Sequence, residues 1–153
     1  MQKATTFLWY DDAAEEAARL YVSLLPNSRV LSVDRMGGEG GPTVVSFVLA
    51  GVEYLAMDAG PMFPFTEAIS IMVLCDDQAE VDRLWEALIA DGGAPSQCGW
   101  LKDRWGLSWQ ITPKRLLELQ RDPDPGRARR VNEAMLQMGK IDIAALEAAA
   151  DAG

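Results

Sequence analysis

The chain has 153 residues and a formal net charge of −9, from 23 acidic and 14 basic side chains. This acidic balance argues against nucleic acid and anionic membranes as partners, because both require a basic surface. The sequence contains no histidine, which excludes a histidine triad, a histidine general base and a histidine metal ligand. No apolar run is long enough to span a membrane, and no secretory signal is visible, so we expect a cytoplasmic protein. In that compartment Cys75 and Cys98, which have no CxxC spacing, are expected to be free thiols.

The first sixty residues predict a strand, a helix and then three strands. A β-branched and aromatic stretch at Ala4–Tyr10 predicts the first strand. Apolar residues at helical spacing predict a helix over Ala13–Leu25, with Asp11 or Asp12 as its N-cap. The three following strands are expected at Arg29–Met36, Thr43–Ala50 and Val52–Ala59.

The same order of elements recurs after the linker Gly60–Thr66. A strand is expected at Ala68–Cys75, followed by a helix over Gln78–Ala90 that Asp76 or Asp77 caps. Three short strands are then expected near Ala94–Cys98, Trp100–Lys102 and Leu107–Thr112. This recurrence predicts two tandem βαβββ units and an α+β fold class.

The last forty residues read as a helical tail. Helices are expected at Lys114–Gln120, Arg127–Met138 and Asp142–Ala150. The segment Asp122–Gly126, DPDPG, should break the chain between the first two helices. Because the tail is too short to fold alone, we expect a single domain over 1–153, with units at 1–60 and 61–113 and the tail at 114–153. The apolar residues of the tail must be buried against the sheet or against a second subunit.

Several segments resemble the PhnB-like branch of the vicinal-oxygen-chelate superfamily, which has the glyoxalase and bleomycin-resistance fold. They are Phe7–Ser28, Phe65–Leu88, Gln97–Pro113 and the tail segment Arg127–Ala149. Members of this branch often carry the name 3-demethylubiquinone-9 3-methyltransferase domain. The resemblance implies two βαβββ units that form curved sheets around a pocket, and it implies a homodimer.

Metal-using members of the superfamily place ligands, typically histidine and glutamate, on the first and last strands of each unit. The turn-glycine-strand motif that supplies the glutamate corresponds here to Asp103–Gln110, so Gln110 stands at the ligand position. In the second unit's first strand the ligand position falls at Ile69 or Ser70, and strand alternation favours Ser70. The first unit's last strand offers Asp58. One carboxylate, one amide and one hydroxyl are a poor set for zinc, nickel or iron, so we expect no metal cofactor beyond a weakly held magnesium or calcium ion at Asp58.

The resemblance implies a mainly apolar and aromatic binding pocket. Its predicted residues are Trp9, Asp58, Ser70, Met72, Trp100, Ser108 and Gln110. Alternation places Ser108 and Gln110 on one face of a strand and turns Trp109 toward a helix. Trp9 suits either the pocket wall or the core, and Trp100 suits the pocket rim, a subunit interface or simple packing.

The function expected from these observations is the binding of a small organic molecule without a tight catalytic metal. The alternative is a lyase, isomerase or dioxygenase that uses Asp58 or a divalent ion, so whether the protein is an enzyme stays open. A third interpretation is an interaction module that acts through its helical tail. Methyltransferase activity is not favoured, because the glycine-rich segment Gly37–Gly41 lies between two expected strands and no helix N-terminus follows it.

Overall fold

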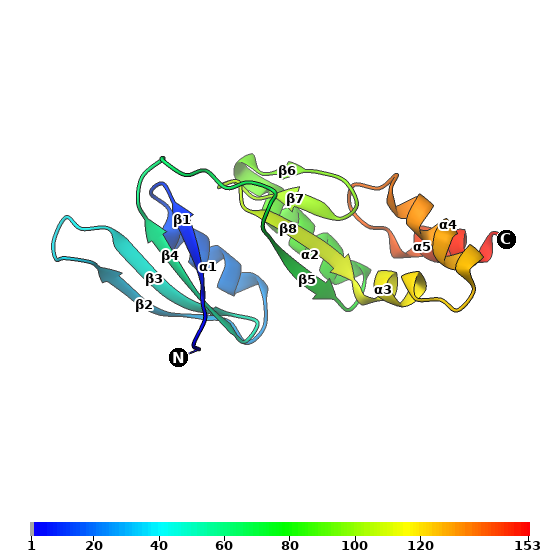
Figure 1. Ribbon diagram of the computed structural model, residues 1–153, viewed down its shortest axis with the longest axis horizontal. Helices are drawn as coiled ribbons and strands as arrows, with labels where there is room; N and C mark the ends of the chain where they lie inside the picture. The colour runs from blue at the N-terminus through cyan, green and yellow to red at the C-terminus, as the bar shows by residue number, and fades with distance from the viewer. Residues whose placement is uncertain (1) are drawn as a thin grey trace. The chain divides into compact units, whose positions relative to one another are not determined.

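The computed structural model describes residues 2–153, which divide into two compact units, one ending at Phe65 and the other spanning Thr66–Gly153. Each unit contains a four-stranded mixed sheet with one helix packed on one face, and the second unit carries three further helices (Figure 1). The predicted α+β class with two tandem βαβββ units and C-terminal helices is confirmed.

The first unit has the strand order β1-β4-β3-β2, in which β1 runs parallel to β4 and the other pairs are antiparallel. Its elements are β1 (Thr6–Tyr10), α1 (Ala14–Leu24), β2 (Arg29–Arg35), β3 (Thr43–Leu49) and β4 (Val52–Asp58). The β3–β4 hairpin turns at Ala50 and Gly51, whose φ angles of 48° and 84° are both in the left-handed region. Such a turn matches the right-handed twist of the two strands.

The core of the first unit lies between its sheet and α1. Phe47 in β3 and Tyr21 in α1 are both fully buried there. The Tyr10 and Tyr21 hydroxyl groups lie 2.9 Å apart and form a hydrogen bond, so the buried polar atoms of both rings are satisfied. The opposite face of the sheet carries no helix of this unit.

The second unit repeats this topology with the strand order β5-β8-β7-β6, and β5 runs parallel to β8. Its elements are β5 (Ser70–Cys75), α2 (Gln78–Ile89), the 3-10 turn η1 (Ala90–Gly92), β6 (Ala94–Pro95), β7 (Trp100–Lys102) and β8 (Ser108–Pro113). Helix α2 packs on one face of this sheet, and the face that carries Gln110 has no helix of this unit packed on it; a face of this kind is called open below.

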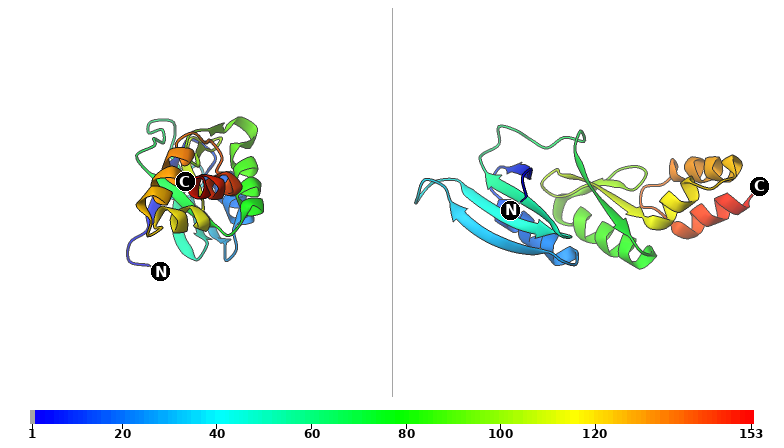
Figure 2. Two further views of the ribbon diagram at one scale, coloured as in Figure 1. Left: turned by 90° about the vertical axis from the view of Figure 1, so that its right-hand side faces the viewer. Right: turned by 60° about the horizontal axis from the view of Figure 1, so that its bottom comes forward.

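The tail consists of α3 (Lys114–Gln120), α4 (Pro125–Met135) and α5 (Ile143–Asp151), which pack side by side (Figure 2). They form a hydrophobic core of their own, made by Leu116, Leu119, Val131, Ile141, Leu146 and Ala150. The apolar residues of the tail therefore bury one another to a large extent. Arg127 and Arg130 donate hydrogen bonds to Ala150 O at 3.2 and 2.7 Å, where a cation also suits the helix dipole. No helix within residues 2–153 is long and apolar enough to cross a membrane.

One prediction about helix starts was wrong, one was displaced by two residues, and one was right. The N-cap of α1 is Ala13, which makes no side-chain cap hydrogen bond. Helix α4 begins at Pro125, inside the segment predicted to break the chain, because proline fits the first helical turn and Asp124 accepts a hydrogen bond from Gly126 N. Asp77 caps α2 as predicted, and its carboxylate accepts from Glu80 N at 2.9 Å.

Candidate functional site

The open face of the second unit's sheet collects five of the predicted pocket residues. Ser70 in β5 pairs in register with Ser108 in β8. Two residues further along, Met72 pairs with Gln110. On the other side of β8, Trp100 in β7 also pairs with Gln110. Register partners point to the same side of a sheet, so these side chains share one face.

The alternate residues of the same strands face α2. Trp109 is 1 % exposed and Ile111 is fully buried, as strand alternation predicts. The two faces follow from strand alternation and register, whereas burial does not separate them, because Ser108 and Thr112 on the Gln110 face are buried too.

Gln110 is held in place by a neighbouring strand. Its Nε2 donates a hydrogen bond to Ser70 Oγ at 2.9 Å. Among residues 2–153, its Oε1 accepts no hydrogen bond. The amide is therefore oriented by the protein and keeps one acceptor for another molecule.

Ser108 contributes a second free polar group to this face. The side chain is 1 % exposed, and within the described chain its Oγ has no hydrogen-bond partner. A buried hydroxyl without a partner destabilises the folded state, so such groups call for an explanation. Ser108 lies in register between Ser70 and Lys102, and the Lys102 ammonium is paired with Glu67. That hydrogen bond holds the pKa of the Glu67 carboxyl below its usual value.

The loop from β7 to β8 is organised by Asp103, a residue that the sequence analysis placed only in a turn. Asp103 is 2 % exposed, and its Oδ1 accepts from Trp105 N and Leu107 N at 3.0 Å each. Its Oδ2 accepts from Trp109 Nε1 at 3.0 Å. Aspartate often accepts backbone hydrogen bonds at the start of a turn, so a signal for this role was present in the sequence.

Asp58, the predicted general base, lies on the other side of its own sheet from Trp9. It pairs in register with Tyr10, which is buried against α1, and its Oδ1 accepts from Ala14 N at 2.7 Å. The carboxylate thereby caps α1 from a distant strand. It borders a surface hollow of about 500 Å³ that has mainly charged walls, including Glu15, Glu16 and Arg35, rather than apolar and aromatic ones. This geometry gives Asp58 a structural role and offers no support for catalysis.

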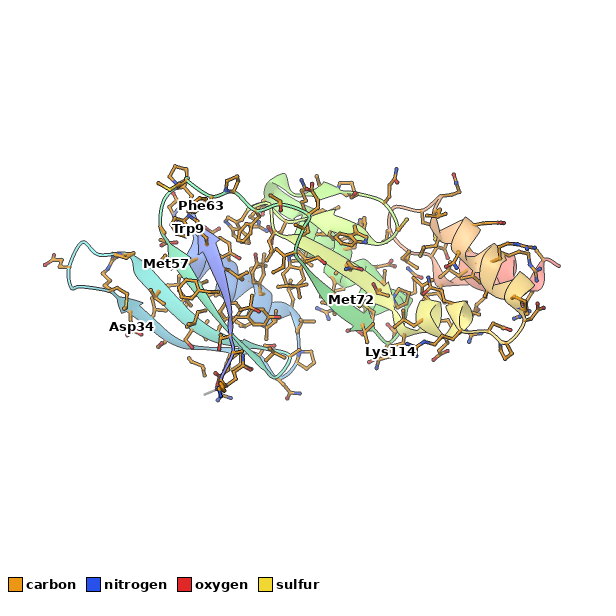
Figure 3. All side chains as sticks on the ribbon, viewed as in Figure 1. Trp9, Asp34, Met57, Phe63, Met72 and Lys114 are labelled. Atoms are coloured by element: carbon orange, nitrogen blue, oxygen red, sulfur yellow. The ribbon has the colours of Figure 1, made fainter. Side chains whose placement is uncertain are left out.

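Trp9 lies on the open face of the first unit's sheet. It pairs in register with Met57, and its ring meets Phe63 edge-on with 5.0 Å between ring centroids (Figure 3). The indole Nε1 donates to Gly60 O at 2.8 Å. The open sheet face of each unit thus carries an aromatic side chain, Trp9 in the first unit and Trp100 in the second.

The residue types that hold metals do not gather in the described chain. Within residues 2–153, no three His, Cys, Asp or Glu side chains are grouped so that they could bind a metal ion. Both cysteines are free, as expected, and Cys75 is fully buried whereas Cys98 is half-buried. Burial raises the pKa of the Cys75 thiol to about 12, which makes it an inert core residue.

The family model for 3-demethylubiquinone-9 3-methyltransferase matches residues 2–112. The chain belongs to this family. A solved PhnB protein from Bacillus cereus is 35 % identical, and the match covers 73 % of this chain and 99 % of that one with a TM-score of 0.67. No curated protein matches the sequence.

Two more distant structures share the fold. The protein PA1353 from Pseudomonas aeruginosa is 21 % identical with a TM-score of 0.59, over 74 % of this chain and 98 % of that one. The fosfomycin resistance protein FosX from Listeria monocytogenes is 17 % identical with a TM-score of 0.57, over 76 % of this chain and 94 % of its own. The family's fold is therefore that of the glyoxalase and vicinal-oxygen-chelate superfamily, as the sequence predicted. The family match ends before α3, so the tail lies outside it.

Proposed function

We propose that the protein binds a small organic molecule on the open face of the second unit's sheet. Met72 and Trp100 supply apolar and aromatic surface for a ring, while Ser108 and Gln110 supply hydrogen-bonding groups for a polar substituent. The observation that carries this proposal is the Ser108 hydroxyl, which is buried and unpaired in the described chain beside an amide that is already oriented. A ligand hydroxyl or carbonyl would satisfy it.

The proposed binding needs no tightly held metal. Gln110 offers an amide where the resemblance implies a carboxylate ligand, and a neutral amide is a weak ligand for divalent ions. FosX from Listeria monocytogenes is described in complex with Mn(II). At 18 % identity this likeness shows the fold alone. Metal analysis of the purified protein tests this part: stoichiometric bound metal would favour the lyase, isomerase or dioxygenase alternative.

The family name alone is not evidence that this chain transfers methyl groups. The glycine-rich segment Gly37–Gly41 joins the antiparallel strands β2 and β3, and Met36 N donates to Pro42 O at 3.0 Å across its base. No helix N-terminus follows the segment, so it lacks the geometry that holds a nucleotide-like cofactor. Binding of S-adenosylmethionine in a calorimetric titration would contradict this interpretation.

We also infer that two copies associate into a homodimer. Each unit leaves one sheet face without a helix of its own, and exposed apolar side chains on those faces include Phe7 and Leu74. Apolar surface of this kind favours burial against another surface. Sedimentation equilibrium measures the mass directly, and a monomer at micromolar concentration would contradict this inference.

The binding proposal predicts opposite effects of one substitution on stability and on affinity. 1-Naphthol is a suitable probe, because it joins an aromatic ring to one hydroxyl, and naphthalene is its partner without the hydroxyl. The variant Ser108→Ala should leave the free protein as stable as before or slightly more stable, because the lost hydroxyl had no partner. The same change should reduce the preference for 1-naphthol over naphthalene by about fivefold, the value of one hydrogen bond.

The matched control is Ser46→Ala, which removes a half-buried serine from the open face of the first unit's sheet. It should change neither the affinity for 1-naphthol nor that for naphthalene, as measured by chemical-shift titration of the labelled protein. Equal losses in both serine variants, or no 1-naphthol shifts at Trp100 and Gln110 in the wild type, would refute the proposed site.

A further inference from the structure

The loop between α4 and α5, residues 136–142, is hydrogen-bonded to the segment that leads into β7. Cys98 N donates to Met138 O and Gly99 N donates to Gly139 O, both at 2.8 Å. These two bonds join the tail to the backbone directly before Trp100. The tail and the candidate site are therefore connected through main-chain atoms.

The contact is also closely packed. Ile141 of the loop is fully buried, and a Cβ placed on Gly99 would lie 3.1 Å from its Cγ1. The same Cβ would lie 3.0 Å from Ile111 O, and the φ of Gly99 is +84°. Only glycine lets the tail approach this closely. Gly99 O in turn accepts from Ile111 N at 2.8 Å, next to Gln110.

The other side of the loop is held by the first residue of α2. Gln78 Nε2 donates to Ile141 O at 2.9 Å, and Gln78 Oε1 accepts from Ile143 N at 2.8 Å. The Lys140 ammonium also pairs with Asp82 one turn further along α2, at 2.9 Å. One side chain thus fixes two backbone groups of the tail, and the loop is held between α2 and the start of β7.

We propose that the tail positions the binding residues of the β7–β8 hairpin, and that Gln78 is the positioning residue that holds the tail in place. The ligand-binding role of Trp100 and Gln110 rests on the proposed function. Their link to the tail is short, because Trp100 directly follows Gly99 and Gln110 directly precedes Ile111. The family match ends at residue 112, so Gln78, Cys98 and Gly99 lie inside the matched region and their partners in the tail lie beyond it.

The test uses the full chain with Gln78→Met, which keeps the length of the side chain and removes its hydrogen bonds. The matched control is Gln120→Met in α3, which removes a half-buried glutamine that bonds Asn132 Oδ1 at 2.9 Å inside the tail. We expect the amides of Cys98 and Gly99 to exchange with solvent at least about tenfold faster in the Gln78 variant only, as their bonds to the tail open. The side-chain NMR signals of Trp100 and Gln110 should shift in the same variant, and the Kd for 1-naphthol should rise about fivefold.

The exchange and chemical-shift measurements need no ligand. They therefore test whether the tail positions Trp100 and Gln110 even if the wild type fails to bind 1-naphthol and the proposed function is refuted. Unchanged exchange at Cys98 and Gly99 in the Gln78 variant would overturn the proposal. Faster exchange with unmoved Trp100 and Gln110 signals would overturn it too, because the tail would then not position the site. If the Gln120 variant showed the same changes, their cause would be a general loss of tail stability, and the proposed role of Gln78 would be overturned.

Discussion

The two βαβββ units have the same strand order and the same parallel pair, yet they hold their helices and hairpins by different means. In the first unit, Asp58 reaches from β4 to cap α1. In the second, Asp77 caps α2 from the adjacent position. Strand β4 therefore ends on the capping residue Asp58, whereas the corresponding strand β8 ends on Pro113.

The hairpins that precede these strand ends also differ. In the first unit the turn at Ala50 and Gly51 combines left-handed backbone angles with two hydrogen bonds, from Ala50 N to Ser28 Oγ at 2.8 Å and from Gly51 N to Asn27 O at 3.0 Å. In the second, Asp103 holds a longer loop through three hydrogen bonds. The two units thus share their topology and a helix on one sheet face, while their turns, helix caps and open faces differ.

Removal of the Asp103 carboxylate should have the largest effect on this comparison. Asp103→Ala leaves Trp105 N, Leu107 N and Trp109 Nε1 without their acceptor in a buried loop. We expect the free energy of unfolding to fall by about 3 kcal/mol. Urea unfolding followed by circular dichroism measures the loss, and a change below about 1 kcal/mol would show that the loop does not depend on this residue.

Removal of the two helix caps should have the next largest effect. Asp58→Ala and Asp77→Ala should each lower the stability by about 1 to 2 kcal/mol, because each helix loses an acceptor for its first turn. Asp12→Ala is the control, since the exposed Asp12 precedes α1 in the sequence and yet is not its cap. Faster amide exchange at Ala14 in the Asp12 variant would contradict the assignment of the cap to Asp58.

The first unit's turn allows a smaller change in the opposite direction. Ala50→Gly should stabilise the protein by about 0.5 kcal/mol, because glycine relieves a left-handed alanine but adds entropy to the unfolded chain. Gly51→Ala should destabilise it by about 1 kcal/mol, since φ is +84° there. Thermal unfolding of both variants gives the two signs, and a loss of stability with Ala50→Gly would show that the left-handed alanine carries no backbone strain.

Acid should have the smallest effect, and it should act on the second unit. Gln78 and Lys140 hold the pKa of Asp82 below its ordinary value of 3.8, and Arg127 does the same for Asp122. Lowered folded-state values mean that the contribution to stability is fully present above pH 3.8 and is lost as the pH falls through those lower values. Both carboxylates lie only partly buried at the surface, where solvent screens their ion pairs, so the loss should be modest.

Amide exchange at about pH 6 and about pH 3 measures this loss separately in each unit. Asp82→Asn and Asp122→Asn should each remove part of the pH dependence of the second unit. A larger increase of amide exchange in the first unit than in the second at low pH would contradict this prediction.

Much of the fold was predictable from local patterns. The alternation of β8 correctly placed Trp109 in the core and Ser108 beside Gln110 on the other face. Asp77 was among the predicted caps because it directly precedes its helix. Asp11 and Asp12 have the same sequence signature before α1 and were predicted as caps, but the structure assigns the cap to a residue far along the chain.

The sequence by itself determined the order of elements, the two units and the face on which each strand residue lies, because periodicity is a local property of the chain. Tertiary structure alone decided which partners the polar side chains take. Asp58 meets α1 across 44 residues, Gln78 meets the tail across 63, and Ser108 is left without a partner among the described residues. Hydrogen bonds depend on distances of a few tenths of an ångström between segments far apart in the chain, and no local pattern fixes those distances.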